Sequence, residues 1–295
     1  MLGNISREEK KYIIDGIKQD IRTDGRKNNQ IRSIEIETNL LQLSHGSARV
    51  RYTNGGTDVI SSVKAEVLPI DDNSVPEDRI EVSVAFTASA NTDFRKRAVE
   101  VSGNVIAENL YKILLSPGAM DLNELVIVPK QFCWKLYVDV QIYKDSGNVI
   151  DMCLLSVLTA LRTTRIPVTT PIKNISQEEK DFDIDDDPTH FRRLSCMSIP
   201  IGITLNKVAD SIFVDATNEE EYCTESSLLV CVNRRKEIVS IQSQQGRIDS
   251  NVLLGSLQVA SMVSENLFAL MDDVVNKDDS LWTSNQVPSS RGLFV

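Results

Sequence analysis

The sequence predicts an α+β protein in which two successive halves each contain a run of strands followed by helices that pack on them. In the first half, alternating apolar segments between residues 31 and 86 precede helical spacing that ends at Leu161. In the second half, alternating segments between residues 199 and 241 precede an apolar helical stripe that ends at Val274. An acidic stretch, residues 176–188, separates the two halves.

The acidic stretch is the best candidate for a domain boundary, because it interrupts the apolar periodicity on both sides. We therefore expect a first domain at residues 1–188, a second domain at residues 189–276 and a loose C-terminal tail at residues 277–295. The tail is polar apart from its end, and frayed termini are common.

The chain begins with a predicted amphipathic helix. Ser6 and Glu9 form a capping box, in which the Ser6 hydroxyl accepts from a first-turn amide and the Glu9 side chain reaches back to the cap. Apolar residues between Tyr12 and Ile17 give this helix one buried side, and we expect it to end near Asp20. Residues 24–26 then form a turn.

Strands of the first half follow from alternation and from turn residues. Residues 54–56, Asn-Gly-Gly, supply the positive φ angles that a tight hairpin needs. Another pair of strands meets at Pro129 and Lys130. The expected strands are residues 31–36, 48–52, 59–67, 80–86, 125–128 and 134–143.

Two helices of the first half show apolar residues at helical spacing. The first covers residues 106–114 and ends at residues 116–118, Ser-Pro-Gly. The second covers residues 151–161 and follows a tight polar turn after the strand that ends at Tyr143. In the second half we expect strands at residues 199–205, 212–214, 228–232 and 238–241, before the long helix.

Composition excludes several classes of protein. No apolar run approaches the roughly 18 residues of a membrane span, and the polar N-terminus is unlike a secretory signal, so we expect an intracellular protein. The net charge of −10 argues against a protein that binds nucleic acid alone. Five cysteines without a CxxC pair, together with only two histidines, predict neither a disulfide framework nor a metal site.

Several motifs, in this order and spacing, resemble the RNase PH family. Residues 22–26 resemble the family's opening Arg-x-Asp-Gly-Arg, and Val214 to Glu221 resemble the strand-and-acid motif of its second domain. Within the family, the chain resembles the non-catalytic ring subunits of the RNA exosome. The other matching segments are residues 46–50, 56–59, 63–66, 119–127, 133–140 and 147–151.

The resemblance implies a first domain like the second domain of ribosomal protein S5, joined to an RNase PH C-terminal domain. Active members use phosphate against the terminal phosphodiester of RNA, so they need groups that hold an anion and protonate or stabilise the leaving oxygen. By resemblance, the phosphate-holding Ser/Thr–Arg pair falls on Val149 and Ile150, and the catalytic Asp falls on Ser227. Thr217 stands where the motif usually has Asn. We therefore expect no catalytic residue, no metal and no cofactor.

Three basic residues, Arg95, Lys96 and Arg97, are candidates for contact with RNA, because rings of this kind thread RNA past basic loops. An exposed basic loop without a ligand fits them equally well. The helix register leaves open whether Arg97 or Val105-Ile106 occupies the position that carries an arginine in active members.

Other charged residues favour structural interpretations. Arg49 and Arg51 share one face of a strand and can pair with acids across the sheet. We expect Asp151 to favour the helix dipole in a first turn, and residues 219–221, Glu-Glu-Glu, to form a solvated face of a loop. The run Arg234, Arg235 and Lys236 fits a solvated turn.

The resemblance implies a structural subunit of a six-membered ring that supports 3′→5′ processing of ribosomal RNA and turnover of messenger RNA. Its implied partners are other RNase PH-like subunits, cap proteins with S1 or KH domains, a hydrolytic nuclease and RNA in the channel, with no membrane. The implied location is nucleus, nucleolus and cytoplasm. The alternatives are a phosphorolytic exoribonuclease, a composite active site shared with a neighbour, and a general RNA-binding module.

Overall fold

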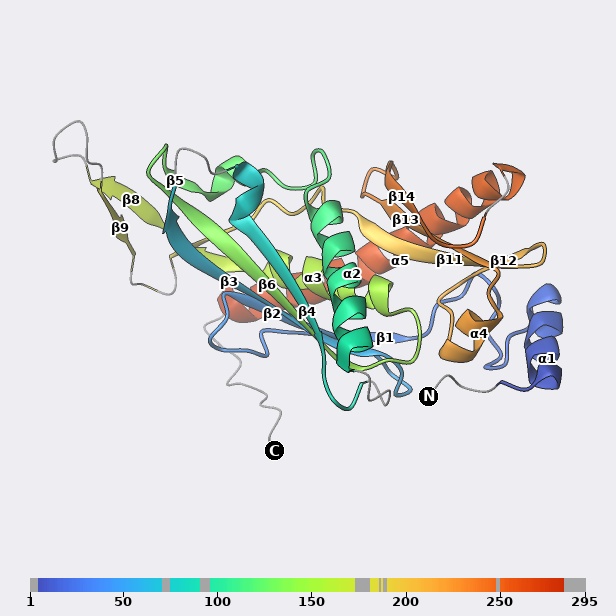
Figure 1. Ribbon diagram of the computed structural model, residues 1–295. Coiled ribbons are helices and arrows are strands. Elements are labelled where there is room, and N and C mark those ends of the chain that lie inside the picture. The colour runs from blue at the N-terminus through green and yellow to red at the C-terminus, as the bar shows by residue number, and fades with distance from the viewer. Residues whose placement is uncertain are drawn as a thin grey trace.

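The computed structural model describes residues 5–70, 75–90, 96–172, 181–185, 187, 190–247 and 250–283. Its largest sheet follows the order β1-β2-β3-β6-β4, with β5 paired to β6 (Figure 1). The strands are β1 (Ile34–Thr38), β2 (Gly46–Tyr52), β3 (Asp58–Pro69), β4 (Ile80–Phe86), β5 (Val126–Val128) and β6 (Phe132–Lys144).

The long strand β3 forms the centre of this sheet, antiparallel to both β2 and β6. The hairpin between β2 and β3 turns at Gly55, whose φ of 80° is the left-handed conformation expected for residues 54–56. Strand β4 is parallel to β6, and a parallel pair requires a crossover connection. Helix α2 (Lys96–Leu114) lies in that crossover and packs against β4. It begins ten residues earlier than the apolar spacing at residues 106–114 predicts.

Helix α3 (Val149–Thr163) is the centre of the molecule. It packs on β2 and β3 with one side and on the second half of the chain, through β11 and α5, with the other. Twelve of its fifteen residues are buried, which explains its nearly continuous apolar sequence. The predicted helix at residues 151–161 is therefore confirmed, and the observed helix is two residues longer at each end.

The second half contains a four-stranded antiparallel sheet in the order β12-β11-β13-β14. Its strands are β11 (Ile201–Val208), β12 (Ser211–Val214), β13 (Ser226–Val232) and β14 (Ile238–Gln245). The short helix α4 (Asn218–Cys223) lies between β12 and β13, and the long helix α5 (Ser250–Thr283) packs on β11 and β13. Figure 1 shows α5 crossing from this sheet to the first half, where it contacts β1.

Four short strands were not predicted. β7 (Arg165–Pro167) pairs with β10 (Phe191–Arg193), and β8 (Thr169–Ile172) pairs with β9 (Asp181–Ile184). Strand β9 lies inside the acidic stretch, and its hairpin with β8 projects from one end of the molecule in Figure 1. The ring of Phe182 packs on Phe132 at 5.1 Å, which anchors this hairpin to the large sheet.

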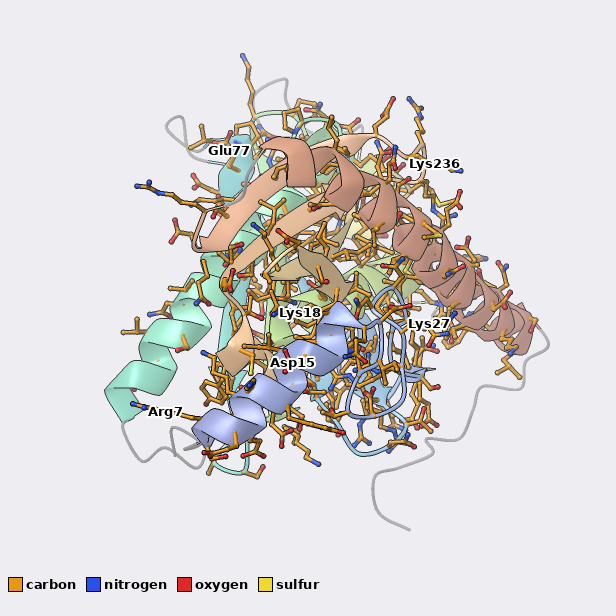
Figure 2. The ribbon with its side chains drawn as sticks, turned by 90° about the vertical axis from the view of Figure 1, so that its right-hand side faces the viewer. Arg7, Asp15, Lys18, Lys27, Glu77 and Lys236 are labelled. Carbon is orange, nitrogen blue, oxygen red and sulfur yellow. The ribbon has the colours of Figure 1, made fainter. Side chains whose placement is uncertain are left out.

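The first helix, α1 (Arg7–Lys18), has the predicted capping box at Ser6 and Glu9. It buries Ile13 and Ile17 in a small separate core with β11, β12 and α4. Figure 2 shows α1 on the outside of the molecule, with α2 on one side of the view and α5 on the other.

Helix α5 continues to Thr283, so the loose tail expected from residue 277 is wrong for residues 277–283. Tertiary contacts hold this last part of the helix: the Asp278 carboxylate pairs with Arg165 at 2.6 Å, and the Trp282 ring lies 4.1 Å from the Arg165 guanidinium. Residues 284–295 lie outside the described residues.

By length and composition alone, residues 253–282 of α5 are long and apolar enough to cross a membrane. This corrects the expectation that no apolar stretch approaches the length of a membrane span. In the structure, this helix contributes Ala260, Val263, Leu267 and Met271 to the main core. That core is one continuous cluster that draws residues from both halves.

A buried carboxylate, Asp215, joins the two halves. Its oxygens accept hydrogen bonds from the Arg32 guanidinium at 2.5 to 3.1 Å, from Arg26 at 2.8 Å and from the Tyr52 hydroxyl at 2.6 Å. The side-chain amide of Asn148 donates to the same carboxylate at 3.2 Å. Burial alone would raise the pKa of Asp215, but the hydrogen bonds and charge of Arg32 hold that pKa below its usual value.

A second buried ion pair supports this joint. The Arg22 guanidinium, whose side chain is inaccessible to solvent, forms a bidentate contact with Glu220 of α4 and donates to the backbone oxygens of Val214 and Asp215. The Arg-x-Asp-Gly-Arg motif thus fastens the N-terminal segment to the second half.

We expect Asp215→Asn to lower the free energy of unfolding by about 3 kcal/mol at pH 7, because it leaves the Arg32 guanidinium without its buried counter-charge. Since the folded pKa of Asp215 is lowered, the contribution is present above the unfolded pKa and is lost as the pH falls through the folded pKa. Urea unfolding at pH 7 and near pH 3 measures both effects.

The matched control for this change is Asp210→Asn, which removes an exposed carboxylate at the turn between β11 and β12. It should change the unfolding free energy by less than about 0.5 kcal/mol. Equal effects of the two substitutions at pH 7 would contradict a joint that depends on Asp215.

Candidate functional site

The turn between β6 and α3 places the start of α3 against the second half. Gly147 has a φ of 88°, and a Cβ on it would lie 2.5 Å from the backbone oxygen of Ala216. Only glycine fits this close approach in this conformation. Asn148 follows with a φ of 59°, and α3 begins at Val149.

A cavity of about 160 Å³ lies between this turn and strand β13. It brings together Val149, Ile150 and Ser227, the three positions singled out in the sequence, although they come from different halves of the chain. Its described lining contains no lysine, arginine or histidine, and one carboxylate. The lining residues are Asn148, Val149, Ile150, Thr204, Asn206, Glu221, Thr224, Ser227, Gln244 and Gln245.

The one carboxylate in this lining, Glu221, contacts the turn directly. Its Oε1 accepts a hydrogen bond from the backbone N–H of Asn148 at 2.7 Å, although Glu221 as a whole residue is exposed. Desolvation raises the pKa of Glu221 to about 7, against the hydrogen bond from Asn148, which lowers it. The start of a helix such as α3 favours an anionic ligand. Here the backbone N–H of Asn148, next to that start, already donates to the Glu221 carboxylate.

A second carboxylate, Asp151, lies in the first turn of α3 and is buried. It accepts from the Thr204 backbone N–H at 2.8 Å and from the Thr204 hydroxyl at 2.7 Å, which ties α3 to β11. Burial raises the pKa of Asp151 to about 7, although both bonds from Thr204 lower it. The expected structural role in a helix first turn fits this geometry.

The acidic run at residues 219–221 does not form a solvated loop, as the sequence analysis expected. It lies in α4, where Thr217 caps the helix and Glu220 completes a capping box. Glu220 is 1% exposed because it is the partner of Arg22. The sequence could have indicated this burial only through the pairing of the Arg22 motif with the acidic run. The two segments are almost two hundred residues apart in the chain.

The candidates for RNA contact are only partly within the described part of the chain. Arg95 lies outside it, and Lys96 and Arg97 are the first residues of α2, with side chains outside the description. The predicted pairing of Arg49 and Arg51 is confirmed: Arg49 binds Asp58 at 2.6 Å and Arg51 binds Glu35 at 3.0 Å.

The basic turn at residues 234–236 is less solvated than expected. Arg234 forms an ion pair with Asp272 of α5, and its guanidinium lies 5.0 Å from the Phe268 ring. Lys236 pairs with Glu265 of the same helix. This turn therefore helps to seat α5 on the small sheet.

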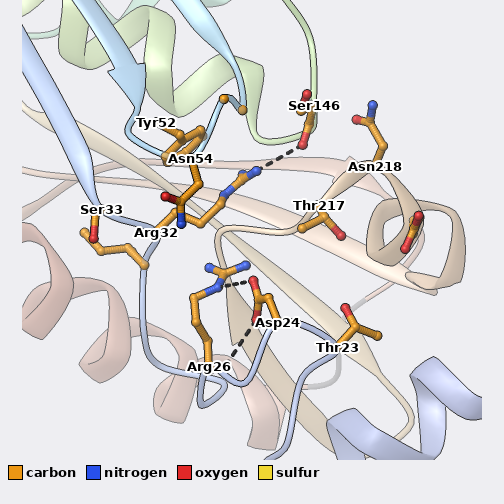
Figure 3. Close-up of a pocket in the computed structure, with 14 residues that line it drawn as sticks. Thr23, Asp24, Arg26, Arg32, Ser33, Tyr52, Asn54, Ser146, Thr217 and Asn218 are labelled. Carbon is orange, nitrogen blue, oxygen red and sulfur yellow. Dashed lines mark hydrogen bonds and ion pairs between the residues drawn. The ribbon is translucent and has the colours of Figure 1, made fainter.

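The sequence analysis missed a larger cavity, of about 590 Å³, which is lined by Arg32, Ser146 and Thr217 among others (Figure 3). Arg26 and Arg32 both line it. Arg26 forms ion pairs with Asp24 and Asp215. Arg32 forms an ion pair with Asp215 and donates to the backbone oxygen of Ser146. Their charges are thus balanced within the protein. Among the described residues, no cluster of three or more histidine, cysteine, aspartate or glutamate side chains could hold a metal ion.

We expect Asp151→Asn to change how stability depends on pH. In the folded protein Asp151 keeps its proton up to its raised pKa of about 7, whereas the unfolded chain releases it near the ordinary aspartate pKa of 3.8. The folded state therefore binds more protons between these values, and its stability falls as the pH rises from about 4 to about 7. The asparagine variant lacks this loss, so its stability relative to the wild type should rise by up to a few kcal/mol between about pH 4 and pH 7.

Urea unfolding of both proteins at several pH values measures this gain, with Asp210→Asn as the control. A constant difference between wild type and Asp151→Asn across the range would show that Asp151 is ionised in the folded protein.

Two family models match the chain in order. The model "3' exoribonuclease family, domain 1", RNase_PH, matches residues 30–167, and "3' exoribonuclease family, domain 2", RNase_PH_C, matches residues 198–261. The fold class predicted from the sequence, α+β with the two RNase PH domains, is confirmed by these matches and by the architecture.

Relatives align over most of the chain. The "Putative exosome complex exonuclease RRP42" of Dictyostelium discoideum is 27% identical, covering 92% of this chain and 98% of that protein. The "Exosome complex component Rrp42" of Methanopyrus kandleri is 25% identical, covering 90% of this chain and 96% of that protein.

Solved structures share the fold. A chain of an "Archaeal exosome core" superposes with a TM-score of 0.71 at 21% identity, covering 89% of this chain and 96% of that one. A chain of the Archaeoglobus fulgidus exosome with RNA bound to the active site gives a TM-score of 0.72 at 21% identity, covering 88% and 96%. With both domain models matched in order and its fold shared, this chain belongs to the 3′ exoribonuclease, or RNase PH, family.

Proposed function

We propose that this protein is a non-catalytic, structural subunit of an exosome-type ring, of the Rrp42 kind. In this role it shapes the channel through which RNA 3′ ends reach a separate hydrolytic nuclease, and so supports ribosomal RNA maturation and messenger RNA turnover. Its similarity to Rrp42 proteins over about nine-tenths of this chain supports this role.

The observation that carries the non-catalytic assignment is the chemistry of the 160 Å³ cavity. Phosphorolysis needs a bound phosphate, and phosphate is held by cations and hydrogen-bond donors. Val149 and Ile150 offer apolar side chains at the helix start, and the cavity is lined by the Glu221 carboxylate instead of a cation. Above its raised pKa of about 7, ionised Glu221 repels an anionic charge 4 Å away by about 1 kcal/mol in water and about 4 kcal/mol near a protein surface.

The position of the expected catalytic aspartate supports the same conclusion. Ser227 is 8% exposed on β13 and lines the cavity. Its hydroxyl is neutral at pH 7 and cannot act as a general acid or base without an activating partner.

The distribution of charge supports a role inside an assembly. A net charge of −10 disfavours RNA binding by the isolated chain, so other subunits must supply most of the positive charge along the RNA path. The basic residues Arg95, Lys96 and Arg97 are this chain's proposed contribution. The proposed partners are other RNase PH-like subunits, caps with S1 or KH domains and a hydrolytic nuclease, in nucleus, nucleolus and cytoplasm.

A phosphate-binding experiment tests the non-catalytic assignment. We expect the wild-type chain to show no saturable binding of inorganic phosphate in the millimolar range, measured by phosphorus NMR line broadening. The double substitution Val149→Ser with Ile150→Arg supplies a hydroxyl and a guanidinium at the helix start, and should create measurable binding. The control, Ile238→Arg, adds the same charge on exposed strand β14 and should not.

Two results would contradict the assignment. One is the release of nucleoside diphosphates when the wild-type chain, alone or in its native assembly with an inactivated hydrolytic nuclease, is incubated with RNA and phosphate. The other is a sulfate ion bound between Asn148 and Ser227 in crystals of the wild-type chain. Native mass spectrometry of the intact assembly tests the ring itself, which should contain five further RNase PH-like subunits.

A further inference from the structure

A second large cavity, of about 570 Å³, lies beside the end of α5. The segment before β2, the strands β7, β9 and β10, and the last turn of α5 all contribute to its lining. Its volume lies in the range of sites that hold groups the size of a few side chains. The cavity is far along the chain from the positions around Val149 and Ser227, and the proposed function does not use it.

One side of this cavity is aromatic. The Arg165 guanidinium pairs with Asp278 at 2.6 Å and lies 4.1 Å from the centre of the Trp282 ring. The rings of Trp282 and Phe191 meet edge to face, with their centres 6.0 Å apart. Because Asp278 balances the Arg165 charge inside the protein, this side of the cavity offers mainly apolar ring surface.

The other sides of the cavity expose large apolar side chains. Leu41 is 42% exposed and Ile184 is 38% exposed, although both line the cavity. Pro167 adds apolar surface from β7. In the described part of the chain these side chains remain open to solvent. Covering them with another apolar group removes their contact with water, which favours binding.

The sequence that follows α5 carries side chains that match this cavity. We call residues 284–295 the tail segment, and it lies outside the described residues. Apart from Val287 and Pro288, residues 284–292 are polar or glycine, whereas residues 293–295 are Leu-Phe-Val. The large apolar side chains of the tail segment are therefore concentrated in its last three residues.

The tail segment starts next to the cavity. Trp282 lines the cavity, and α5 ends one residue later, at Thr283. Residues 284–292 separate Thr283 from Leu293. A linker of nine residues spans at most about 30 Å, and about 15–18 Å on average when it is flexible. A linker of this kind keeps the apolar residues near the cavity at an effective concentration on the order of 1 mM.

We propose that residues 293–295 dock in this cavity of the same chain. Their leucine and phenylalanine pack against Trp282, Leu41 and Ile184. The linker favours this occupant over a segment of a second copy or of another protein, because either of these must compete with the local concentration of the tail segment. Docking uses apolar contact and needs no free charge at the cavity. It is independent of the catalytic status of the protein.

Trp282 reports docking directly, since it is one of two tryptophans in the chain and the other, Trp134, is buried. In the full chain with Trp134→Phe, acrylamide quenching measures how far Trp282 is open to solvent. We expect Leu293→Ser with Phe294→Ser to raise the quenching constant about twofold, because the apolar cover that excludes water is lost. The control, Val287→Ser, changes an apolar residue of the same tail segment and should leave quenching unchanged.

A blocked peptide with the sequence of residues 284–295 tests the cavity itself. Added to the chain that carries both tail serines, it should restore the shielding of Trp282 with a Kd below about 1 mM. It should not change quenching in the chain with an unaltered tail segment, whose cavity is already filled. Leu41→Ser in the serine chain should weaken the peptide about tenfold. Leu43→Ser, which removes a leucine that is 97% exposed and is not among the lining residues, should not.

Three results would overturn the proposal. The first is unchanged quenching after Leu293→Ser with Phe294→Ser. The second is a peptide that does not shield Trp282 in the serine chain, or that binds equally well when serines replace its leucine and phenylalanine. The third is shielding of Trp282 that rises with protein concentration together with a dimer in sedimentation, which would assign the docked segment to a second copy. Thermal unfolding of each variant confirms that the chain compared is folded.

Discussion

The structure depends on one buried carboxylate. Moving a charge out of water costs several kcal/mol unless hydrogen bonds and opposite charges replace the lost hydration. Asp215 obtains this replacement from Arg26 and Arg32 of the N-terminal segment, from Tyr52 of β2 and from Asn148 at the start of α3. These donors come from three places in the first half, so they reach the carboxylate together only in the folded arrangement of the two halves.

The same joint fixes the candidate site. Because Asn148 donates its side chain to Asp215 and its backbone N–H to Glu221, the start of α3 has one position relative to β12 and α4. Gly147 makes this possible, since a larger residue would collide with Ala216. The cavity between α3 and β13 is therefore rigid, and its chemistry follows directly from the side chains in it. Its described lining supplies apolar groups, amides, hydroxyls and one carboxylate, but no cation that would balance the charge of a phosphate group.

Much of the fold could be predicted because its elements carry local signals. Strand β4 was predicted with its observed bounds, and the Ser6 capping box and the Gly55 turn follow from the residues at those positions. Helix α4 was missed because its six residues are too few to show a period. The last turns of α5 were missed because they are held by Arg165, a partner that no local pattern reveals.

Residues of the candidate site also differ in how far the sequence predicts them. Val149, Ile150 and Ser227 were identified through a family resemblance, and the structure places them around one cavity. The contact of Glu221 with Asn148 and the burial of Glu220 depend on partners distant in the sequence, so the residues alone predicted a solvated acidic run. No pattern in the sequence indicated that Asp185, Asp187 and His190 line a cavity of about 570 Å³.

Internal ion pairs of arginine support the proposal that the isolated chain binds RNA weakly. Many arginines are bound internally to carboxylates and therefore present little free charge at the surface. These are Arg22, Arg26, Arg32, Arg49, Arg51, Arg162, Arg165, Arg193 and Arg234. Such pairs hold α4, α5 and the N-terminal segment in place. The carboxylates balance the guanidinium charges, which therefore attract phosphate less. Together with the net charge of −10, this internal pairing disfavours binding of nucleic acid by the isolated chain, which fits the proposed role of a subunit whose main contacts are with its neighbours.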